Sequence, residues 1–275
     1  MTDERDMNST SRQAPAEQNA RKGVRGWLAD VAAAFALLSI VPLPARWRCG
    51  AAWPRALRAL PLAGAGVGLA SALALAGAHV LLPDVPAAAV LLGLLAGIIF
   101  SGALHEDGLA DVADALGGRS RQRRLEIMRD ARIGAFGVLA LIFAISLQAS
   151  ALLALMAQGW ARAFFALVLA HAGSRLAVVW LMHALPHARK DGMSVAAGRP
   201  GPGVLAQAAL VVLAVAALCL PWLEAGALLT ALLAGAGVAA GMTALLRRLL
   251  GGQTGDAAGA TEVITRTALL LALAA

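Results

Sequence analysis

Long apolar stretches recur along this chain and constrain its fold more than any other feature. A helix needs about 20 apolar residues to cross a bilayer. Six stretches reach that length: Pro61–Leu82, Pro86–Leu104, Gly134–Ala157, Trp160–Leu185, Gly203–Leu223 and Ala225–Leu246. Because lipid offers the backbone no hydrogen-bond partners, such stretches must form helices or the strands of a closed barrel.

Composition favours helices. Hydrophobic residues make up 60% of the 275 positions and charged residues only 14%, whereas a soluble domain carries about a quarter charged residues. Leu and Ala dominate, and there is no Tyr. We therefore expect an all-α, polytopic integral membrane bundle of six strong spans with two weaker flanking helices. Residues 1–26 are polar and are expected to be a disordered tail, and residues 27–275 are expected to form a single membrane-embedded catalytic domain.

The two flanking stretches are expected to be incomplete spans. Trp27–Val41 contains Asp30, has basic residues on both sides and ends in closely spaced prolines, which break helices. It is predicted to be interfacial or re-entrant. Thr261–Ala275 is short and contains Glu262 and Arg266, so we expect a partial or shallow helix.

Basic residues indicate the orientation of the bundle. The chain carries 23 Lys and Arg and a formal charge of +7, which in a soluble protein would suggest nucleic acid as a partner. Here the basic residues gather in alternate connections, as they do in the cytoplasmic loops of membrane proteins. We therefore expect a lipid bilayer and no nucleic acid as partner. The connections rich in Arg and Lys are predicted to be cytoplasmic: residues 46–58, 119–132, 189–199 and 247–248.

An acidic motif, LHEDGLADVADALGG, follows the second strong stretch. Asp107, Asp111 and Asp114 are spaced i, i+4, i+7, so on a helix they share an arc of about 60°. Like charges on one helix face repel each other, and a divalent cation would remove that cost. Carboxylate oxygens suit Mg²⁺ or Mn²⁺. We favour a metal site over a solvated helix end, because acidic groups at a membrane boundary are costly unless they are used.

Glu106 and His105, which precede Asp107, indicate a function less specifically than the three aspartates do. Glu106 points about 100° away from Asp107 and is expected to be an exposed charge. His105 could orient a ligand or act as a base, or it could be a boundary histidine without such a role.

An arginine-rich segment, RSRQRRLEIMRDARIG, comes next. Arg129 and Arg132 flank Asp130, and arginine forks match phosphate geometry. Asp130 could be a fourth metal ligand or could pair with an arginine; we favour contact with metal or substrate. Within the fourth span, Arg175 could line a polar pocket or pair with another helix, and the pocket is favoured.

A second polar motif, LLGGQTGDAAGATE, follows the sixth strong span. Gly251 is expected to cap that helix. Thr254, Gly255 and Asp256 stand among small residues, which allow a ligand to approach the backbone closely. The alternation of spans places this motif on the same membrane face as the acidic motif, and we expect Asp256 to face the acidic helix.

Three segments together resemble the cobalamin synthase (adenosylcobinamide-GDP ribazoletransferase) family. HEDGLADVAD at residues 105–114, LEIMRDARIG at 125–134 and GGQTGDAAGA at 251–260 occur in the order of that family's motifs. Ala115 and Ala131 depart from its usual Gly and Ser, and no carboxylate is lost. The resemblance covers nearly the whole chain after the tail.

The resemblance implies a Mg²⁺-dependent transfer in the bacterial inner membrane. A ribose hydroxyl of α-ribazole, or of its 5′-phosphate, attacks the cobinamide-linked phosphate of adenosylcobinamide-GDP, and GMP leaves. Asp256 would then be a metal ligand or would orient the attacking hydroxyl. The residue patterns and the resemblance together give the candidate site. The catalytic candidates are His105, Asp107, Asp111, Asp114 and Asp256; the candidate substrate contacts are Arg129, Arg132, Arg175, Thr254 and Gly255; and the candidate metal ligands are Asp107, Asp111, Asp114, Asp130 and Asp256.

Two other functions fit the sequence less well. Residues 107–110 begin like the D-G-x-x-A-R signature of CDP-alcohol phosphotransferases, but Asp111 replaces the Arg. A cation transporter would need acidic residues near the middle of its spans, whereas here they cluster at span ends with arginines. Phosphate chemistry is therefore favoured.

Overall fold

The computed structural model describes residues 23–42, 44 and 53–275. Within these ranges the chain is helical, and an isolated bridge between His187 and Gln253 is the one β-type pairing. The elements are α2 (Val24–Leu38), η1 (Arg55–Ala59), α4 (Leu60–Leu81), α5 (Pro86–Phe100), α6 (Leu104–Ala115), α7 (Arg121–Ile127), α8 (Ala135–Gln158), α9 (Trp160–Ala184), α10 (Met193–Ala197), α11 (Pro202–Cys219), α12 (Ala225–Leu250) and α13 (Gly255–Ala274).

Six of these helices are long and apolar enough to cross a membrane: α4 together with η1, α8, α9, α11, α12 and α13. The all-helical fold is thus confirmed, and five of the expected strong spans are present nearly at their predicted bounds. Two helices differ from the prediction. The helix α5 is not a candidate span by itself, and α13 is one.

The stretch predicted as a strong span over Pro86–Leu104 is bent: α5 alone is not among the candidate spans, and α5 together with α6 is a broken span or a re-entrant loop. The helix α5 ends at Phe100, and α6 continues at an angle of 90° to it. Gly102 and Ala103, at the break, have positive φ angles of 64° and 54°, which turn the chain out of the helical path. The acidic motif therefore forms its own helix, and hydropathy could not reveal the break because the residues around it remain apolar or small.

The prediction of a partial C-terminal helix was wrong. The helix α13 begins at Gly255 and runs 20 residues, long and apolar enough to span a membrane. Glu262 and Arg266 lowered the apparent hydropathy, but both side chains are buried and paired inside the bundle. Charge that is neutralised by neighbouring helices does not exclude a helix from the membrane.

The helix α2 is short, as expected, and is not among the candidate spans. It begins at Val24, within the segment predicted to be a tail; residues 1–22 of that segment lie outside the described residues. Asp30 is buried and pairs with Arg55 at 3.0 Å and Arg58 at 2.8 Å. These ion pairs attach α2 to η1.

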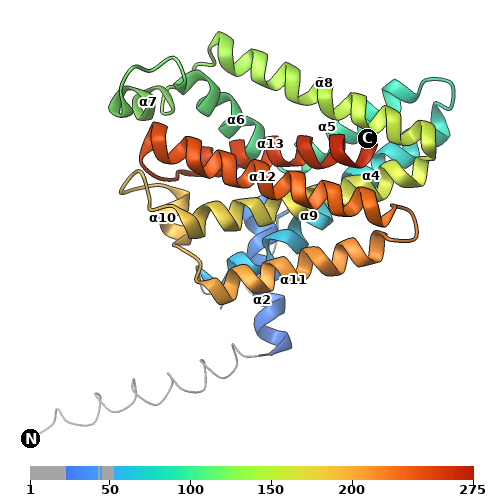
Figure 1. The fold of residues 1–275 in the computed structure, drawn as a ribbon, viewed down its shortest axis with the longest axis horizontal. Coiled ribbons are helices and arrows are strands. Elements are labelled where there is room, and N and C mark those ends of the chain that lie inside the picture. The colour runs from blue at the N-terminus through green and yellow to red at the C-terminus, as the bar shows by residue number, and fades with distance from the viewer. Residues whose placement is uncertain (1–22, 43, 45–52) are drawn as a thin grey trace, which may run out of the picture.

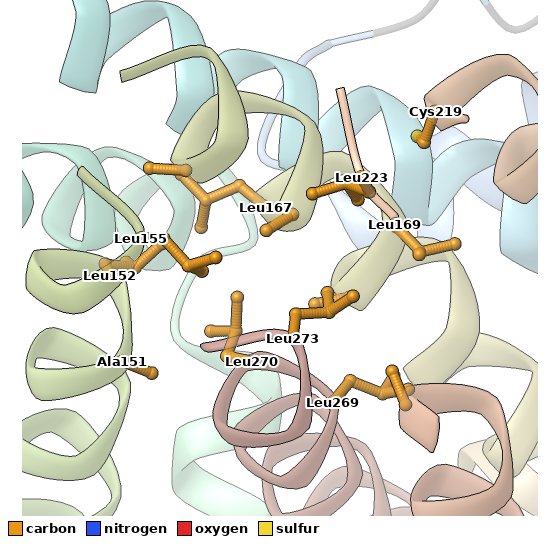
Figure 2. Close-up of a cluster of buried hydrophobic side chains, with 14 of the residues drawn as sticks. Ala151, Leu152, Leu155, Leu167, Leu169, Cys219, Leu223, Leu269, Leu270 and Leu273 are labelled. Carbon is orange, nitrogen blue, oxygen red and sulfur yellow. The ribbon is translucent and has the colours of Figure 1, made fainter. Parts of the chain in front are cut away.

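One apolar cluster is formed by residues of α4, α5, α8, α9, α12 and α13, together with the C-terminal end of α11 and the turn that follows it. Figure 2 shows leucines of these elements turned toward one another. Its labelled members are Ala151, Leu152, Leu155, Leu167, Leu169, Cys219, Leu223, Leu269, Leu270 and Leu273. The helix α13 also packs against α6 and α12, so the C-terminal helix is an interior element of the bundle.

The bundle has two distinct ends (Figure 1). The α6–α8, α9–α11 and α12–α13 connections gather at one end, and the C-terminus lies toward the other. Arg121, at the start of α7, links these connections. Its Nε donates to the carbonyl oxygen of Leu250 at 2.6 Å, and its Nη2 donates to that of Ala188 at 2.8 Å. The connections rich in Arg thus share one end, which we call the basic end.

Candidate active site

The acidic helix α6 and the first turn of α13 touch at the basic end. A Cβ added to Gly108 would lie 2.7 Å from the carbonyl oxygen and 3.0 Å from the Cα of Asp256. Only a glycine permits so close an approach of the two backbones. The two polar motifs, far apart in the sequence, are therefore in direct contact in the structure.

Four carboxylates of the two motifs interact electrostatically. Asp111 is repelled by Asp107, Asp256 and Asp114, in decreasing order, and is attracted by Arg189. Arg189 also binds Asp256, with 3.3 Å between Nη1 and Oδ2. The structure thus places Asp256 beside the acidic helix, with one arginine offsetting part of the repulsion.

Asp114 also stabilises the start of α8. Its carboxylate accepts hydrogen bonds from the backbone N–H of Gly134 at 2.7 Å and of Gly137 at 2.9 Å. These groups belong to the start of α8, which has no capping side chain of its own. Asp114 therefore satisfies the N-terminus of α8, and a role as metal ligand stays a prediction.

Thr254 and Gly255 form the start of α13. Thr254 is the N-cap, and its Oγ1 accepts a hydrogen bond from the Ala257 N–H at 3.1 Å. Gly251 caps α12 with a φ of 68°, which confirms the predicted cap. The short connection between these caps holds Asp256 in the first turn of α13, facing α6.

The arginine-rich segment supplies three exposed ion pairs, of which one, Arg123–Glu126, lies within α7. Arg129 binds Asp191 at 2.8 Å, which joins the α7–α8 connection to the α9–α10 connection. Arg132 binds Asp130 at 2.8 Å, and these hydrogen bonds lower the pKa of Asp130 to about 2 and raise the pKa of Arg132. Of the two alternatives for Asp130, the structure shows the pairing with arginine; its role as ligand, and the substrate contacts of Arg129 and Arg132, stay predictions.

A buried charged network lies behind the acidic helix. Arg175 on α9 pairs with Glu262 on α13, and Arg266 on α13 binds Glu106 on α6 at 2.6 Å and Glu262 at 3.7 Å. The prediction that Glu106 is exposed was wrong, because α6 turns this face inward and Glu106 is only 6% exposed. Arg175 forms the inter-helix pair that the sequence left as its alternative.

Sequence reasoning missed three residues of this region. Glu262 and Arg266 were treated as flaws in a weak helix, although their i, i+4 spacing in an apolar stretch was a signal of pairing. Arg189 entered the sequence prediction only as part of a basic connection. Its contact with Asp256 could not be found from sequence spacing, since the two residues belong to different connections.

A basic cleft adjoins Asp256. It is open to solvent, has a volume of about 610 Å³ and lies between α7 and the connection that follows α9. Its cationic lining side chains could bind phosphate oxygens: Arg121, Arg129, Arg189 and Lys190.

The donor set fits Mg²⁺ in its chemistry. Asp107, Asp111 and Asp256 offer carboxylate oxygens, which Mg²⁺ prefers. In the part of the chain that the structure describes, no three His, Cys, Asp or Glu side chains are grouped closely enough to hold a metal ion. Mg²⁺ usually retains waters and takes substrate phosphate oxygens as further ligands, and the role of these aspartates as its ligands stays a prediction.

Fold and site together define a multi-helix membrane protein with carboxylates and arginines assembled at one end of its bundle. A family model described as cobalamin-5-phosphate synthase matches residues 30–274. The chain belongs to this family and is, by that membership, a transferase.

Its relatives agree with this assignment. The adenosylcobinamide-GDP ribazoletransferase of Azorhizobium caulinodans is 47% identical over 253 residues, which cover 89% of this chain and 94% of the relative. The proteins of the same name from Mesorhizobium japonicum and Bradyrhizobium diazoefficiens are 42% and 41% identical; they cover 89% and 92% of this chain, and 92% and 95% of their own lengths. No solved structure matches the chain.

Proposed function

We propose that this protein transfers the adenosylcobinamide phosphate group of adenosylcobinamide-GDP to a ribose hydroxyl of α-ribazole or its 5′-phosphate. The products are GMP and adenosylcobalamin or its 5′-phosphate. The observation that carries the proposal is the meeting of α6 and α13 at Gly108 and Asp256, next to a basic cleft. Family membership favours this reaction over the CDP-alcohol phosphotransferase and cation-transporter alternatives.

The residues of the site have separable tasks in this reaction. Arg189 and Arg129 line the basic cleft and would bind the phosphates of the nucleotide, stabilising charge as it develops. Mg²⁺, held by Asp107 and Asp111, would neutralise the pyrophosphate. Asp256 would either add a metal ligand or orient the hydroxyl.

The proposed reaction is a substitution at phosphorus. The bond between the ribose oxygen and the cobinamide-linked phosphorus forms, and the bond from that phosphorus to the oxygen of the GMP phosphate breaks. The hydroxyl proton passes to a carboxylate of the site or to water. The protein mainly positions the partners and compensates charge.

We also propose that the basic end faces the cytoplasm of the bacterial inner membrane. This proposal is supported by the excess of Arg and Lys in the connections of this end. Connections rich in these residues are retained on the cytoplasmic side of membranes. A nucleotide substrate would meet the site there.

The test is an assay of GMP release. Purified protein in lipid nanodiscs is given adenosylcobinamide-GDP, α-ribazole and Mg²⁺. We expect GMP to appear only when both substrates are present, to stop with excess EDTA, and to return with Mg²⁺ or Mn²⁺. The Azorhizobium relative serves as positive control; GMP release by that relative and none by this protein would contradict the proposal, and full activity in EDTA would exclude the metal.

A further inference from the structure

Two carboxylates of the acidic motif bind other helices, one near each end of α6. Near the start of α6, Glu106 accepts a hydrogen bond from Nη2 of Arg266 on α13 at 2.6 Å. Near its end, Asp114 accepts two hydrogen bonds from backbone N–H groups at the start of α8. Asp107 and Asp111 stand between these two attachments in the sequence. The position of these two carboxylates therefore depends on how α6 is attached to its neighbours.

The attachment near the start of α6 is buried and belongs to a larger network. The side chains of Glu106 and Arg266 are only 8% and 4% exposed. Nη1 of Arg266 also lies 3.7 Å from Oε1 of Glu262. Glu262 accepts a hydrogen bond from Oγ of Ser174 at 2.7 Å and pairs with Arg175, both on α9. Two arginines and two glutamates thus connect α6, α13 and α9, and leaving this arrangement would strand a buried charge without a partner.

The backbone around this attachment sets how near the two helices lie. A Cβ added to Gly259 on α13 would lie 3.1 Å from the carbonyl oxygen and 3.2 Å from the Cα of His105 on α6. The helix α6 starts directly after the 90° break, and among the described residues no side chain caps its N-terminus. Contact between smooth backbone surfaces fixes a distance, whereas a directional, charge-assisted hydrogen bond also fixes where one helix lies along the other. We assign this second task to the pair of Glu106 and Arg266.

We propose that Arg266 is a positioning residue of the reaction, which acts through Glu106 to hold Asp107 at the site. This inference rests on the proposed function. Asp107 directly follows Glu106 in the sequence, so a displacement of Glu106 along α13 moves the neighbouring carboxylate with it. Asp107 is thereby kept beside Asp111 and Asp256, the carboxylates with which it interacts electrostatically. A misplacement of about 1 Å at a reaction site can cost about 100-fold in rate.

The deciding variant replaces both charges of the pair by apolar side chains. Replacing a buried ion pair by hydrophobic residues of similar volume is often neutral or stabilising, so Glu106→Met combined with Arg266→Met should keep the melting temperature while it removes the directional contact. With protein in nanodiscs, we expect kcat for GMP release to fall about 100-fold and the Mg²⁺ concentration for half-maximal rate to rise at least about tenfold. A pair that only stabilises the fold predicts wild-type kinetics in this stable variant, and that result would overturn the proposal.

The matched control is another buried ion pair, that of Asp30 and Arg58 at 2.8 Å, which joins α2 to η1 and not to α6. Asp30→Asn should lower the melting temperature, because it leaves a buried arginine without this partner. Assayed below its melting transition, this variant should keep the wild-type kcat and the wild-type Mg²⁺ dependence. An equal loss of kcat in Asp30→Asn would show that any loosening of the bundle slows the reaction, which would contradict the particular role of Arg266.

A distance measurement tests the same inference without turnover. With Cys49 and Cys219 replaced, spin labels are attached at Asp107→Cys and Leu271→Cys, and pulsed electron paramagnetic resonance measures the distance between them. Leu271 lies on α13 and is 38% exposed, so this distance reports a displacement of α6 along α13. We expect one narrow distribution when Glu106 and Arg266 are present, and a shifted or broader one when both are replaced by Met. An identical distribution in the two proteins would exclude the positioning role.

The two readouts separate this inference from the proposed function. A wild type that releases no GMP, but whose label distance changes when the pair is replaced by Met, would contradict the reaction and retain Arg266 as the residue that holds Asp107 in place. GMP release by wild type, together with unchanged kinetics and an unchanged label distance in the Met variant, would retain the reaction and exclude the role of Arg266.

Discussion

Asp111 and Asp114 lie almost one turn apart on α6, yet their surroundings differ. Asp114 accepts two backbone hydrogen bonds from the start of α8. Asp111 is partly buried and is repelled by Asp107, Asp256 and Asp114, whereas Arg189 offsets part of this repulsion. Asp114 therefore stabilises the fold, whereas Asp111 adds electrostatic repulsion between carboxylates.

This contrast predicts opposite effects of the same substitution. Asp111→Asn should abolish most turnover and raise the melting temperature of the metal-free protein, because it removes repulsion. Asp114→Asn should lower that melting temperature by a loss of about 1 kcal/mol, because the amide keeps one acceptor oxygen for the two backbone N–H groups and one hydrogen bond is lost. Thermal unfolding in detergent with EDTA checks both. A lower melting temperature for Asp111→Asn would contradict the assignment of this residue as a repulsive element.

Asp256 offers a second test at this scale. If it is a metal ligand, Asp256→Asn should raise the Mg²⁺ concentration for half-maximal GMP release at least about tenfold. If it orients the hydroxyl, the substitution should lower kcat and leave that concentration unchanged. We expect the first result. Asp84→Asn, in the turn between α4 and α5, is the control and should change neither quantity.

Glu106 and Arg266 form a buried ion pair between α6 and α13. Glu106→Gln leaves the Arg266 charge without this partner, and breaking a buried pair typically costs about 3–5 kcal/mol. We expect a large fall in melting temperature. Glu126→Gln breaks the exposed pair with Arg123 and should change stability by no more than about 1 kcal/mol. Equal falls in melting temperature for the two substitutions would show that the buried pair stabilises the fold no more than the exposed pair does.

At the scale of elements, the site depends on how closely α6 approaches α13. Gly108→Ala would place a methyl group 2.7 Å from the Asp256 carbonyl oxygen, so the two helices must move apart. A displacement of about 1 Å can cost about 100-fold in rate, and we expect a loss of that order. Gly237→Ala, on α12, meets no atom within 4 Å and should retain full activity, as GMP release will show.

The whole molecule places its basic connections at one end and its C-terminus toward the other. If the basic end is cytoplasmic, a C-terminal reporter after Ala275 should lie outside. With Cys49 and Cys219 replaced, single cysteines at Ser120 and Lys190 should resist a membrane-impermeant thiol reagent in whole cells. A cysteine at Val85, which is 50% exposed, should react. Labelling of Ser120→Cys from outside would reverse the orientation.

The sequence by itself determined the helical membrane fold and the motifs of the site. Hydropathy and length predicted α4, α8, α9, α11 and α12, because a helix in lipid must be long and apolar along its whole length. The acidic spacing of Asp107, Asp111 and Asp114 and the segment around Asp256 identified the chemical groups. Alternation of basic connections correctly placed both motifs at one end.

Tertiary structure decided what those local patterns do not contain. The 90° break at Gly102 and Ala103 and the burial of Glu106 depend on the helices that surround α6. Glu262 and Arg266 looked unsuited to a span until α6 and α9 supplied their partners, because a charge is acceptable in the interior only where another element neutralises it. Composition and spacing describe one segment at a time, whereas the site and its adjoining cleft exist only where segments meet.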